Sequence, residues 1–323
     1  MQNNTKQLAT VSVDMLVPEK HPYRFFAQQF DYDRLFSVME IPQSEVGADG
    51  FGADRLMKCT LLRAAEDLSG RQAQRFLAEN VAAKWFCGFG LFEKTPEHST
   101  LSKFFTRVGV ERMGKFFEEA RRQLKEKGYL QEFFTFVDST ALISKLQVWE
   151  ERDKAIQAGY EDFNNEVLSK VSKDPDVRIG AKSSKKFWVG FKKNVSRDMR
   201  DGLINKVTVT HANRTDADCV DDILPDTGAV SGDKGFVPAI PTIEARGLHS
   251  MVILRNNMKD KNSEKDCFIT KLRSPFEGAF AHQNRRARYS GIGKNQMSEY
   301  LNAFAFNLKT LLAIEEKRKR VLA

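Results

Sequence analysis

The sequence has few cysteines and histidines, and none of them stand at the spacing of metal ligands. Its 323 residues contain four Cys and five His. Zinc ribbons and disulfide frameworks need cysteines in close pairs, so these two classes of protein are excluded. We expect all four cysteines to be reduced and mostly buried; they are Cys59, Cys87, Cys219 and Cys267.

Long apolar runs are also missing. No segment approaches the roughly 20 apolar residues that a membrane span needs, and the stretch from Met1 to Lys6 has no signal-peptide core. Hydrophobic residues nevertheless make up 41% of the chain, which is enough for a packed core and argues against wholesale disorder. The sequence therefore predicts a soluble intracellular protein with room for two domains and with no membrane partner.

Positive charge is in modest excess and is concentrated in three segments. The chain has 51 basic and 43 acidic residues, a formal net charge of +8, which alone says little about a partner. The distribution is more informative, because clustered Lys and Arg bind phosphate backbones. Solvated protein faces carry similar clusters, so both explanations stay open for each cluster. The clusters are Lys182, Lys185, Lys186, Lys192, Lys193, Arg197 and Arg200, then Arg285, Arg286, Arg288 and Lys294, and finally Lys317 to Arg320.

Residues 1–130 have the pattern of an all-α domain. Apolar residues recur at helical spacing over 54–127, and Asp31 is placed to cap a short helix over 32–39. Two helices meet at Gly70 in a tight turn, as in a helix-turn-helix. Because many helical domains have this geometry without touching DNA, the turn is a weak sign. We interpret this region as an N-terminal helical DNA-binding or dimerisation domain.

From residue 131 onward the pattern changes to strands that alternate with helices. Strands are expected over 133–138, 187–195, 203–210, 229–232 and 250–254, and helices around 217–224, 240–246, 275–288 and 296–317. The second and third strands form a hairpin. This order predicts an α/β fold with a mixed five-stranded sheet that helices cover on both faces. The domain spans 131–316, holds a polar, partly helical insertion at about 145–185, and is followed by a basic tail at 317–323.

Three acidic residues stand at special places in this pattern. Asp138 ends the first strand, Asp233 follows the fourth strand in a Gly-Asp-Lys-Gly turn, and Glu277 lies on a late helix. If the first and fourth strands are parallel neighbours, their carboxyl ends bring Asp138 and Asp233 together. Clustered carboxylates repel one another unless cations neutralise them, and oxygen ligands prefer Mg²⁺ or Mn²⁺. We predict that the three acids hold two such ions for an in-line phosphodiester displacement.

Each acid also has a simpler explanation when it is taken alone. Asp138 would be a hydrogen-bonded buried acid, and Asp233 would be a turn residue. Glu277 would pair with Arg273, one helical turn earlier, on a surface helix. Only the joint placement of the three acids favours the catalytic interpretation.

Several short motifs occur together in this chain. In the helical domain they are Trp-Phe-Cys-Gly at 85–88 and Pro-Glu-His-Ser-Thr-Leu-Ser at 96–102. In the second domain they are Phe-Val-Asp-Ser-Thr at 136–140, the hairpin segments 186–192, 202–204 and 209–213, Gly-Asp-Lys-Gly-Phe at 232–236, Arg273 with Glu277, and 288–295. Together these segments, which cover most of the chain, resemble the DDE transposases of bacterial insertion sequences, in the group whose catalytic domain is ribonuclease H-like. Each motif alone is weak, but the combination is specific.

The resemblance implies an enzyme that cuts DNA at the ends of a mobile element and joins the 3′-hydroxyl ends to target DNA. Asp138, Asp233 and Glu277 would hold the two Mg²⁺ or Mn²⁺ ions. Arg273 would contact a phosphate near the scissile bond. The basic clusters supply the other expected DNA contacts, which are Lys186, Lys192, Lys193, Arg285, Arg286, Arg288 and Lys294.

The same resemblance implies double-stranded DNA as the partner, both the terminal inverted repeats, which the N-terminal helices would recognise, and the target. Such enzymes handle two DNA ends together, so we expect a homodimer in a synaptic complex. The expected location is the cytoplasm of a bacterium, on the nucleoid. Two other functions stay open, namely a domesticated sequence-specific DNA-binding protein without catalysis and a nuclease without strand transfer. The intact triad argues against the first, and joined DNA products would separate the second from a transposase.

Overall fold

The computed structural model describes residues 11–41, 50–183, 186–258, 261–281 and 285–322, without the side chains of residues 183, 277–281 and 322. The chain divides into two compact units. One consists of Met1–Val108 with Leu311–Ala323, and the other is Gly109–Thr310. The boundary that the sequence predicts at residue 130 lies inside the second unit, and the predicted division into domains stays a prediction.

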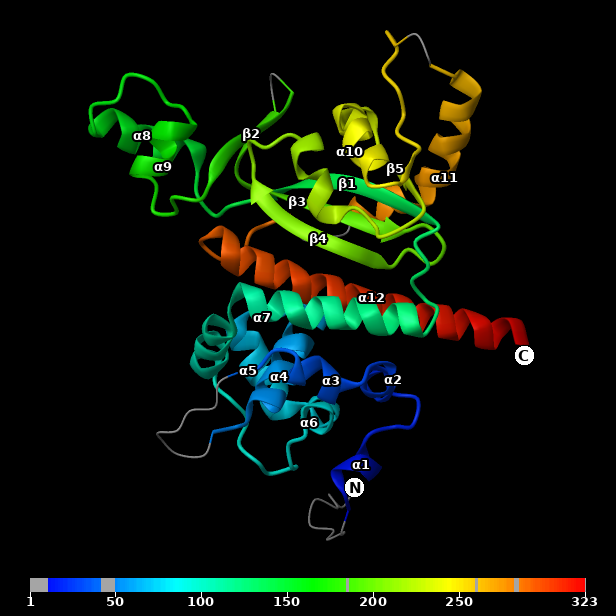
Figure 1. Ribbon diagram of the computed structural model, residues 1–323. Coiled ribbons are helices and arrows are strands. Elements are labelled where there is room, and N and C mark those ends of the chain that lie inside the picture. Colours follow the sequence, from blue (N-terminus) through cyan, green and yellow to red (C-terminus); the bar gives the residue numbers. More distant parts are fainter. Residues whose placement is uncertain (1–10, 42–49, 184–185, 259–260, 282–284, 323) are drawn as a thin grey trace, which may run out of the picture. The chain divides into compact units, whose positions relative to one another are not determined.

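The regular elements that the structure describes in the first unit are all helices. They are α1 (Val13–Leu16), α2 (Pro22–Gln29), α3 (Tyr32–Ser37), α4 (Ala53–Ala65), α5 (Gly70–Glu79), α6 (Val81–Cys87), the first part of α7 (His98–Glu126) and the last part of α12 (Ile292–Leu322) (Figure 1). Asp31 caps α3, as predicted, because its side chain accepts a hydrogen bond from the N–H of Arg34 at 3.0 Å. Ser69 and Gln72 form a capping box at the start of α5. The turn between α4 and α5 is therefore well defined, and its contact with DNA stays a prediction.

An aromatic cluster lies in the core of this first unit. The rings of Tyr23 and Tyr32 each lie 5.9 Å from the ring of Phe86, and the hydroxyl of Tyr23 donates a hydrogen bond to Glu66 at 2.9 Å.

The four cysteines of the chain are free thiols, three of them buried and only Cys267 exposed. This confirms the prediction of mostly buried cysteines, and their reduced state stays a prediction.

The second unit is built on a mixed β-sheet. Its strands are β1 (Phe134–Ile143), β2 (Arg178–Ser183), β3 (Lys186–Asp198), β4 (Ile204–His211), β5 (Ala229–Ser231) and β6 (His249–Ser250). The strand order is β2-β3-β1-β5-β6, and β4 also pairs with β3 (Figure 1). Because β1 is antiparallel to β3 and parallel to β5, the predicted α/β class with a mixed sheet is confirmed.

The edges of the sheet differ from the prediction. The sequence does not predict β2, which lies in the polar insertion and is defined by antiparallel pairing with β3 and not by an apolar pattern. The last strand, expected over 250–254, is reduced to His249–Ser250. The N–H groups of Met251 and Ile253 still donate to the carbonyls of Val230 and Gly232, at 2.8 and 3.1 Å. The sheet therefore has six strands where the sequence predicts five.

The first strand is longer than predicted. β1 continues to Ile143, because it stays paired with β3 as far as Gly190. Asp138 therefore lies inside the strand and not at its end. The parallel pairing with β5 is shorter and stops at Phe136, so Asp138 lies just beyond the end of that parallel pair.

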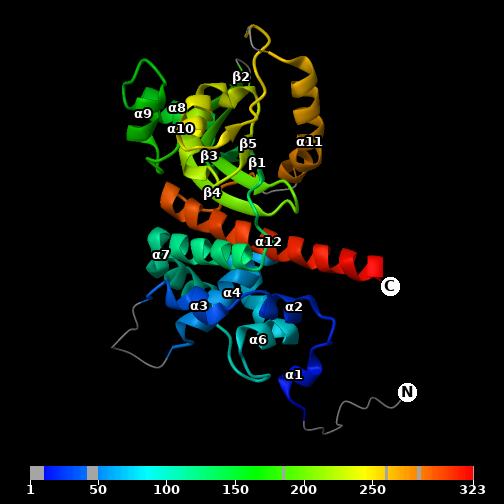
Figure 2. The same ribbon diagram turned by 45° about the vertical axis from the view of Figure 1, so that its right-hand side comes forward.

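Helices cover both faces of the sheet. They are α8 (Val148–Gln157), α9 (Asn165–Val171), η1 (Ala217–Ile223), η2 (Lys234–Ala239), α10 (Ile240–Ala245), α11 (Ser263–Ala281) and α12 (Ile292–Leu322). Val137 and Val230 pack with residues of η1, η2 and α10, whereas Ala229 packs with Ile269 of α11. Both views accordingly show α10 and α11 on opposite sides of β5 (Figure 1, Figure 2). Within the described residues, no helix has the length and apolar character needed to cross a membrane.

Helix α11 begins well before the predicted start near residue 275. Asn262 caps it, because its side chain accepts hydrogen bonds from the N–H groups of Glu264 and Lys265, each at 3.0 Å. Pro275 therefore lies inside the helix, where the sequence pattern suggested its first turn.

Amide side chains attach the first part of α12 to β4. Asn307 accepts a hydrogen bond from the N–H of Ile204 at 2.7 Å and donates one to its carbonyl at 2.8 Å. Gln296 accepts from the N–H of Val209 at 2.5 Å and donates to the carbonyl of Val207 at 3.1 Å. These bonds satisfy backbone groups along β4 that a neighbouring strand would otherwise pair.

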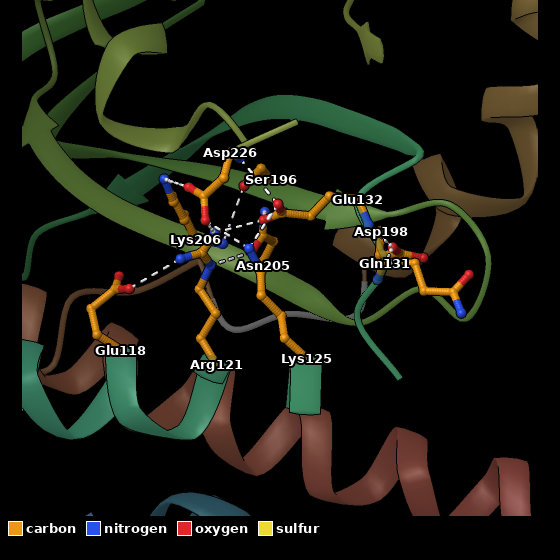
Figure 3. Close-up of polar contacts among 10 residues, drawn as sticks. All are labelled: Glu118, Arg121, Lys125, Gln131, Glu132, Ser196, Asp198, Asn205, Lys206 and Asp226. Carbon is orange, nitrogen blue, oxygen red and sulfur yellow. Dashed lines mark hydrogen bonds and ion pairs between the residues drawn. The ribbon is translucent and has the colours of Figure 1, made fainter. Parts of the chain in front are cut away.

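A network of charged side chains holds the chain where it enters β1 (Figure 3). Glu132 is only 1% exposed, and its carboxylate accepts hydrogen bonds from Arg121 at 2.6 Å and Lys125 at 2.8 Å. Asn205 adds a third bond at 2.7 Å. Asp226, which precedes β5, pairs with the same two cations, each at 2.6 Å. The network thus joins the second part of α7 to the starts of β1 and β5.

Candidate active site

The two acids that follow the parallel strand pairing lie at the same level of the sheet. Phe136 of β1 is in register with Ser231 of β5. Asp138 and Asp233 each follow two residues later, beyond the last paired residues, where α/β sheets usually hold their sites. The predicted parallel pairing of these strands is confirmed, and it brings the two acids together.

Asp138 is half-buried, and its charge is only partly compensated. Burial is the main reason that its pKa rises from 3.8 to about 6. The negative charges of Asp233 and Asp216 also raise the pKa, whereas the N–H of Ser139, which donates at 2.8 Å, and the guanidinium of Arg273 lower it. Asp138 therefore binds a proton more tightly than a solvated Asp does.

Asp233 is exposed and caps the short helix η2. Its Oδ1 accepts a hydrogen bond from the N–H of Gly235 at 2.8 Å. The turn is close-packed, since a side chain at Gly232 would begin 3.0 Å from the ring of Phe236. The capping bond uses one carboxylate oxygen, so the turn role and a ligand role for the other oxygen are compatible.

A third acid, Asp216, lies beside them and is not among the acids that the sequence pattern predicts. Its Oδ1 forms an ion pair with Lys192 at 2.8 Å. Its Oδ2 lies 3.0 Å from the point where a side chain at Gly235 would begin, and Oδ1 of Asp233 lies 2.9 Å from the same point. One signal was available, because Asp216 follows the end of β4 as Asp233 follows the end of β5.

Arg273 approaches the acids from α11 and is only 6% exposed. Its Nη1 donates a hydrogen bond to the carbonyl of Gly232 at 3.2 Å, and its guanidinium lies 4.9 Å from the ring centroid of Phe136. It thus supplies positive charge to the acids from inside the protein. The contact with a DNA phosphate that the family resemblance implies for Arg273 stays a prediction.

Glu277 lies on α11 one helical turn after Arg273, but its side chain is outside the described residues. Its meeting with the two aspartates therefore stays a prediction. Among the side chains that the structure describes, no group of three His, Cys, Asp or Glu residues is arranged to hold a metal ion.

The donor chemistry of the described residues nevertheless fits a divalent cation. The candidate donors are carboxylate oxygens, which Mg²⁺ and Mn²⁺ prefer, and the pKa of Asp138 is raised first by burial and then by the nearby charges of Asp233 and Asp216. The hydroxyl of Ser231, two residues before Asp233, is 1% exposed and has no hydrogen-bond partner among the described residues. A buried polar atom of this kind is usually satisfied by a water molecule or an ion.

Two predicted DNA contacts on β3 are engaged within the protein. Lys193 is 4% exposed and forms an ion pair with Glu299 of α12 at 2.9 Å. Lys192 pairs with Asp216 and also donates to the carbonyl of Arg214 at 2.6 Å. Neighbouring residues of a strand point to opposite faces, and both faces of β3 are covered here. Contrary to the sequence interpretation, Lys193 is therefore buried and does not reach a phosphate in this placement.

The other predicted DNA contacts lie at or near the surface. Lys186, Arg285, Arg286 and Lys294 are exposed, and Arg288 is half-buried. The carbonyl of Arg285 accepts a hydrogen bond from the N–H of Ile143 at 2.6 Å. This basic segment is thereby attached to the end of β1, the strand that carries Asp138. Contacts between these residues and DNA stay predictions.

Two family models match the sequence. One, described as Transposase domain (DUF772), matches residues 11–107, and the other, described as Transposase DDE domain, matches residues 165–313. Together they cover about three quarters of the chain. These matches, on a mixed sheet with acids beyond its parallel strands, define the protein as a transposase. Within that class the chain belongs to the DDE transposases of the insertion-sequence type and is an enzyme.

Among solved structures, the piggyBac transposase synaptic complex with hairpin DNA, determined by cryo-EM, is similar to the chain with a TM-score of 0.42 and 7% sequence identity. The similarity covers 91% of this chain and 75% of that chain. No curated protein sequence matches the chain. The assignment to the family therefore comes from the two family models.

Proposed function

We propose that this transposase cuts DNA at the ends of an insertion sequence and transfers the 3′-hydroxyl ends to target DNA. Two divalent metal ions, held by Asp138, Asp233 and Glu277, would support both steps. The observation that carries the proposal is the register of β1 and β5, which sets Asp138 level with Asp233. Because a sheet is rigid, this register keeps the two carboxylates together before any DNA binds.

The metal ions, when bound, would activate a water molecule or a 3′-hydroxyl group and stabilise the leaving oxygen. The chain's own residues hold and orient these ions. Asp138 is fixed by its place inside β1 and by the N–H of Ser139, which binds one of its carboxylate oxygens. Arg273 favours the ionised form of Asp138, because its positive charge lowers the pKa of that acid.

Double-stranded DNA is the proposed substrate, and exposed basic residues near the acids are its proposed contacts. Arg285 and Arg286 lie beside the end of β1, because Arg286 forms a bridge with Ile143 and the carbonyl of Arg285 accepts the N–H of Ile143. Lys294 lies in the first turn of α12. Lys186 at the start of β3 is exposed as well. Clusters of this kind neutralise phosphates, so DNA affinity should fall steeply with salt.

The helical first unit is the proposed reader of the terminal inverted repeats. Two copies of the chain would join two DNA ends in a synaptic complex, since transposition needs both ends at once. The family of the chain and its basic clusters support a bacterial, cytoplasmic location on the nucleoid.

Cleavage of a plasmid that carries the DNA flanking the gene tests the proposal. In Mg²⁺ or Mn²⁺ the wild type should cut at the element's ends and give joined products. The variants Asp138→Asn, Asp233→Asn and Glu277→Gln should bind this DNA but not cut it. Asp221→Asn is a matched control that should cut normally, because Asp221 forms an exposed ion pair with Arg246 at 2.7 Å.

Each departure from this result has a defined meaning. Normal cutting by the three acid variants would refute the triad. Cutting by the wild type without joined products would indicate a nuclease without strand transfer. Binding without cutting by the wild type would favour a DNA-binding relic.

A further inference from the structure

Lys192 and Asp216 form an ion pair at the border of the acidic site. Their side chains are 13% and 29% exposed, and Nζ of Lys192 lies 2.8 Å from Oδ1 of Asp216. Lys192 also donates to the carbonyl of Arg214 at 2.6 Å. The ammonium group is thus directed at the loop after β4 and fixes the orientation of the Asp216 carboxylate.

Gly235 lies between Asp216 and Asp233. A side chain at Gly235 would begin 3.0 Å from Oδ2 of Asp216 and 2.9 Å from Oδ1 of Asp233. The same oxygen of Asp233 accepts the N–H of Gly235 at 2.8 Å. The two carboxylates therefore enclose one glycine, and the position of each limits the position of the other.

We infer that Asp216, oriented by Lys192, is a positioning residue of the transposase active site, which holds the turn of Asp233 in place. The inference rests on the proposed function, because the turn that Asp216 supports carries a proposed ligand of the divalent-cation site. Replacing a group that supports metal ligands typically weakens metal binding about 10- to 100-fold. Lys192 accordingly supports Asp216 and is not one of the DNA contacts.

Asp218, in the first turn of η1, shows what a nearby carboxylate does without this role. It is exposed, and its side chain accepts a hydrogen bond from the N–H of Thr215 at 3.1 Å. Asp216 instead faces Gly235, and its charge acts on Asp138. Asp218 is therefore a matched control, with the same residue type, a position two residues away and the same change in net charge.

Binding of Mn²⁺ alone to the full-length protein tests the inference, with free Mn²⁺ followed by electron paramagnetic resonance. Asp216→Asn should weaken binding about 10- to 100-fold, and Asp218→Asn should bind like the wild type. Asp138→Asn should lose this binding. If Asp138→Asn loses binding but Asp216→Asn does not weaken it, the inference is overturned and the proposed function stands. Undiminished binding by Asp138→Asn would refute the proposed metal site itself.

Gly235→Ala makes the same test without a change in charge. The glycine does not have a positive φ, so its backbone accepts alanine, and only the added methyl group disturbs the two carboxylates. We expect weaker Mn²⁺ binding together with a thermal unfolding temperature close to that of the wild type. Unchanged Mn²⁺ binding in this variant would overturn the inference even if Asp216→Asn fails to fold.

Lys192→Gln separates support of Asp216 from contact with DNA. A plot of log affinity against log salt concentration has a negative slope, and the loss of one phosphate contact makes this slope shallower by about 0.9. Lys192→Gln should keep the wild-type slope and weaken Mn²⁺ binding, because Asp216 loses the partner that orients it. The exposed Lys294 offers the opposite case, and Lys294→Gln should make the slope shallower while binding Mn²⁺ normally. A shallower slope with normal Mn²⁺ binding in Lys192→Gln would overturn the assignment of Lys192.

Discussion

Two acids near the beginning of β1, Glu132 just before the strand and Asp138 inside it, differ in how their charge is compensated. At the start of the strand, Glu132 binds Arg121 and Lys125. Burial alone would raise the pKa of Glu132, but hydrogen bonds from these two cations bring it below its usual value of 4.5. Further along the strand, Asp138 has Asp233 as a neighbour, and burial raises its pKa to about 6.

The difference separates a structural acid from an acid that needs a ligand. Glu132 has its cations within the chain, so its buried charge is part of a complete network. Asp138 keeps an excess of negative charge, which costs folding free energy unless a cation arrives from outside. The protein thus concentrates its uncompensated charge at the proposed metal site. Four experiments test this contrast.

The largest effect on stability is expected when Glu132, the acid whose charge is compensated, is replaced. Glu132→Gln removes the buried charge that Arg121 and Lys125 share, and removing one partner of a buried ion pair costs about 3 to 5 kcal/mol. Urea denaturation should show a loss of this size in the free energy of unfolding. Glu118→Gln removes an exposed partner of the same arginine, 3.3 Å away, and should cost less than about 1 kcal/mol. Similar losses in both variants would contradict the role given to Glu132.

The next largest effect on stability is expected when a divalent cation supplies positive charge near Asp138. A ligand that binds only the folded state adds about 2.7 kcal/mol at a hundred times its dissociation constant. Saturating Mn²⁺ should therefore raise the thermal unfolding temperature of the wild type and leave that of Asp138→Asn unchanged. An equal rise in both proteins would locate the ion elsewhere.

Removing the uncompensated charge should stabilise the metal-free protein. The folded-state pKa of about 6 lies above the usual 3.8, so ionisation of Asp138 disfavours the folded state. This cost grows as the pH rises from about 4 to about 6 and is complete above that range. After allowance for partial exposure, Asp138→Asn should be more stable than the wild type by about 2 kcal/mol at pH 8. Thermal unfolding from pH 4 to pH 8 measures the difference, which should vanish at the acid end.

The smallest effect is expected at Asp226, whose side chain is 51% exposed. Burial would raise its pKa, but hydrogen bonds from Lys125 and Arg121 lower it below 3.8. The stabilisation is therefore present at neutral pH and declines as the pH falls below about 4. Because solvent screens the pairs, Asp226→Asn should cost about 1 kcal/mol at pH 7 and less in acid. Asp221→Asn, in an exposed pair, is the control for urea denaturation, and a cost that persists in acid would count against the ion pairs.

The strands that carry the acids were predictable because their signals are local. Val137 and its neighbours form an apolar run before Asp138, and Gly232 and Gly235 mark the turn around Asp233. The hairpin of β3 and β4 has the same kind of signal. The parallel pairing of β1 and β5 then follows from a general rule for α/β folds.

Features set by tertiary contacts were not predictable from local patterns. Lys193 looks like a surface lysine in a basic cluster, but its partner Glu299 is 106 positions away. Asp216 gains its importance only because Gly235 folds against it. The early start of α11 differs from these cases, because Asn262 gave a local capping signal that the pattern around Pro275 outweighed.

The short parallel pairing between β1 and β5 also determines when a newly made chain can bring Asp138 and Asp233 together. It joins Phe134 to Ala229 across the whole intervening sequence through three register pairs. Such distant contacts close late, because the segment between them must lose its freedom first. During synthesis Asp138 leaves the ribosome well before Asp233, so a nascent chain carries one acid without its partner. Under the proposed function, the capacity to cut would therefore be among the last properties that a newly made molecule acquires.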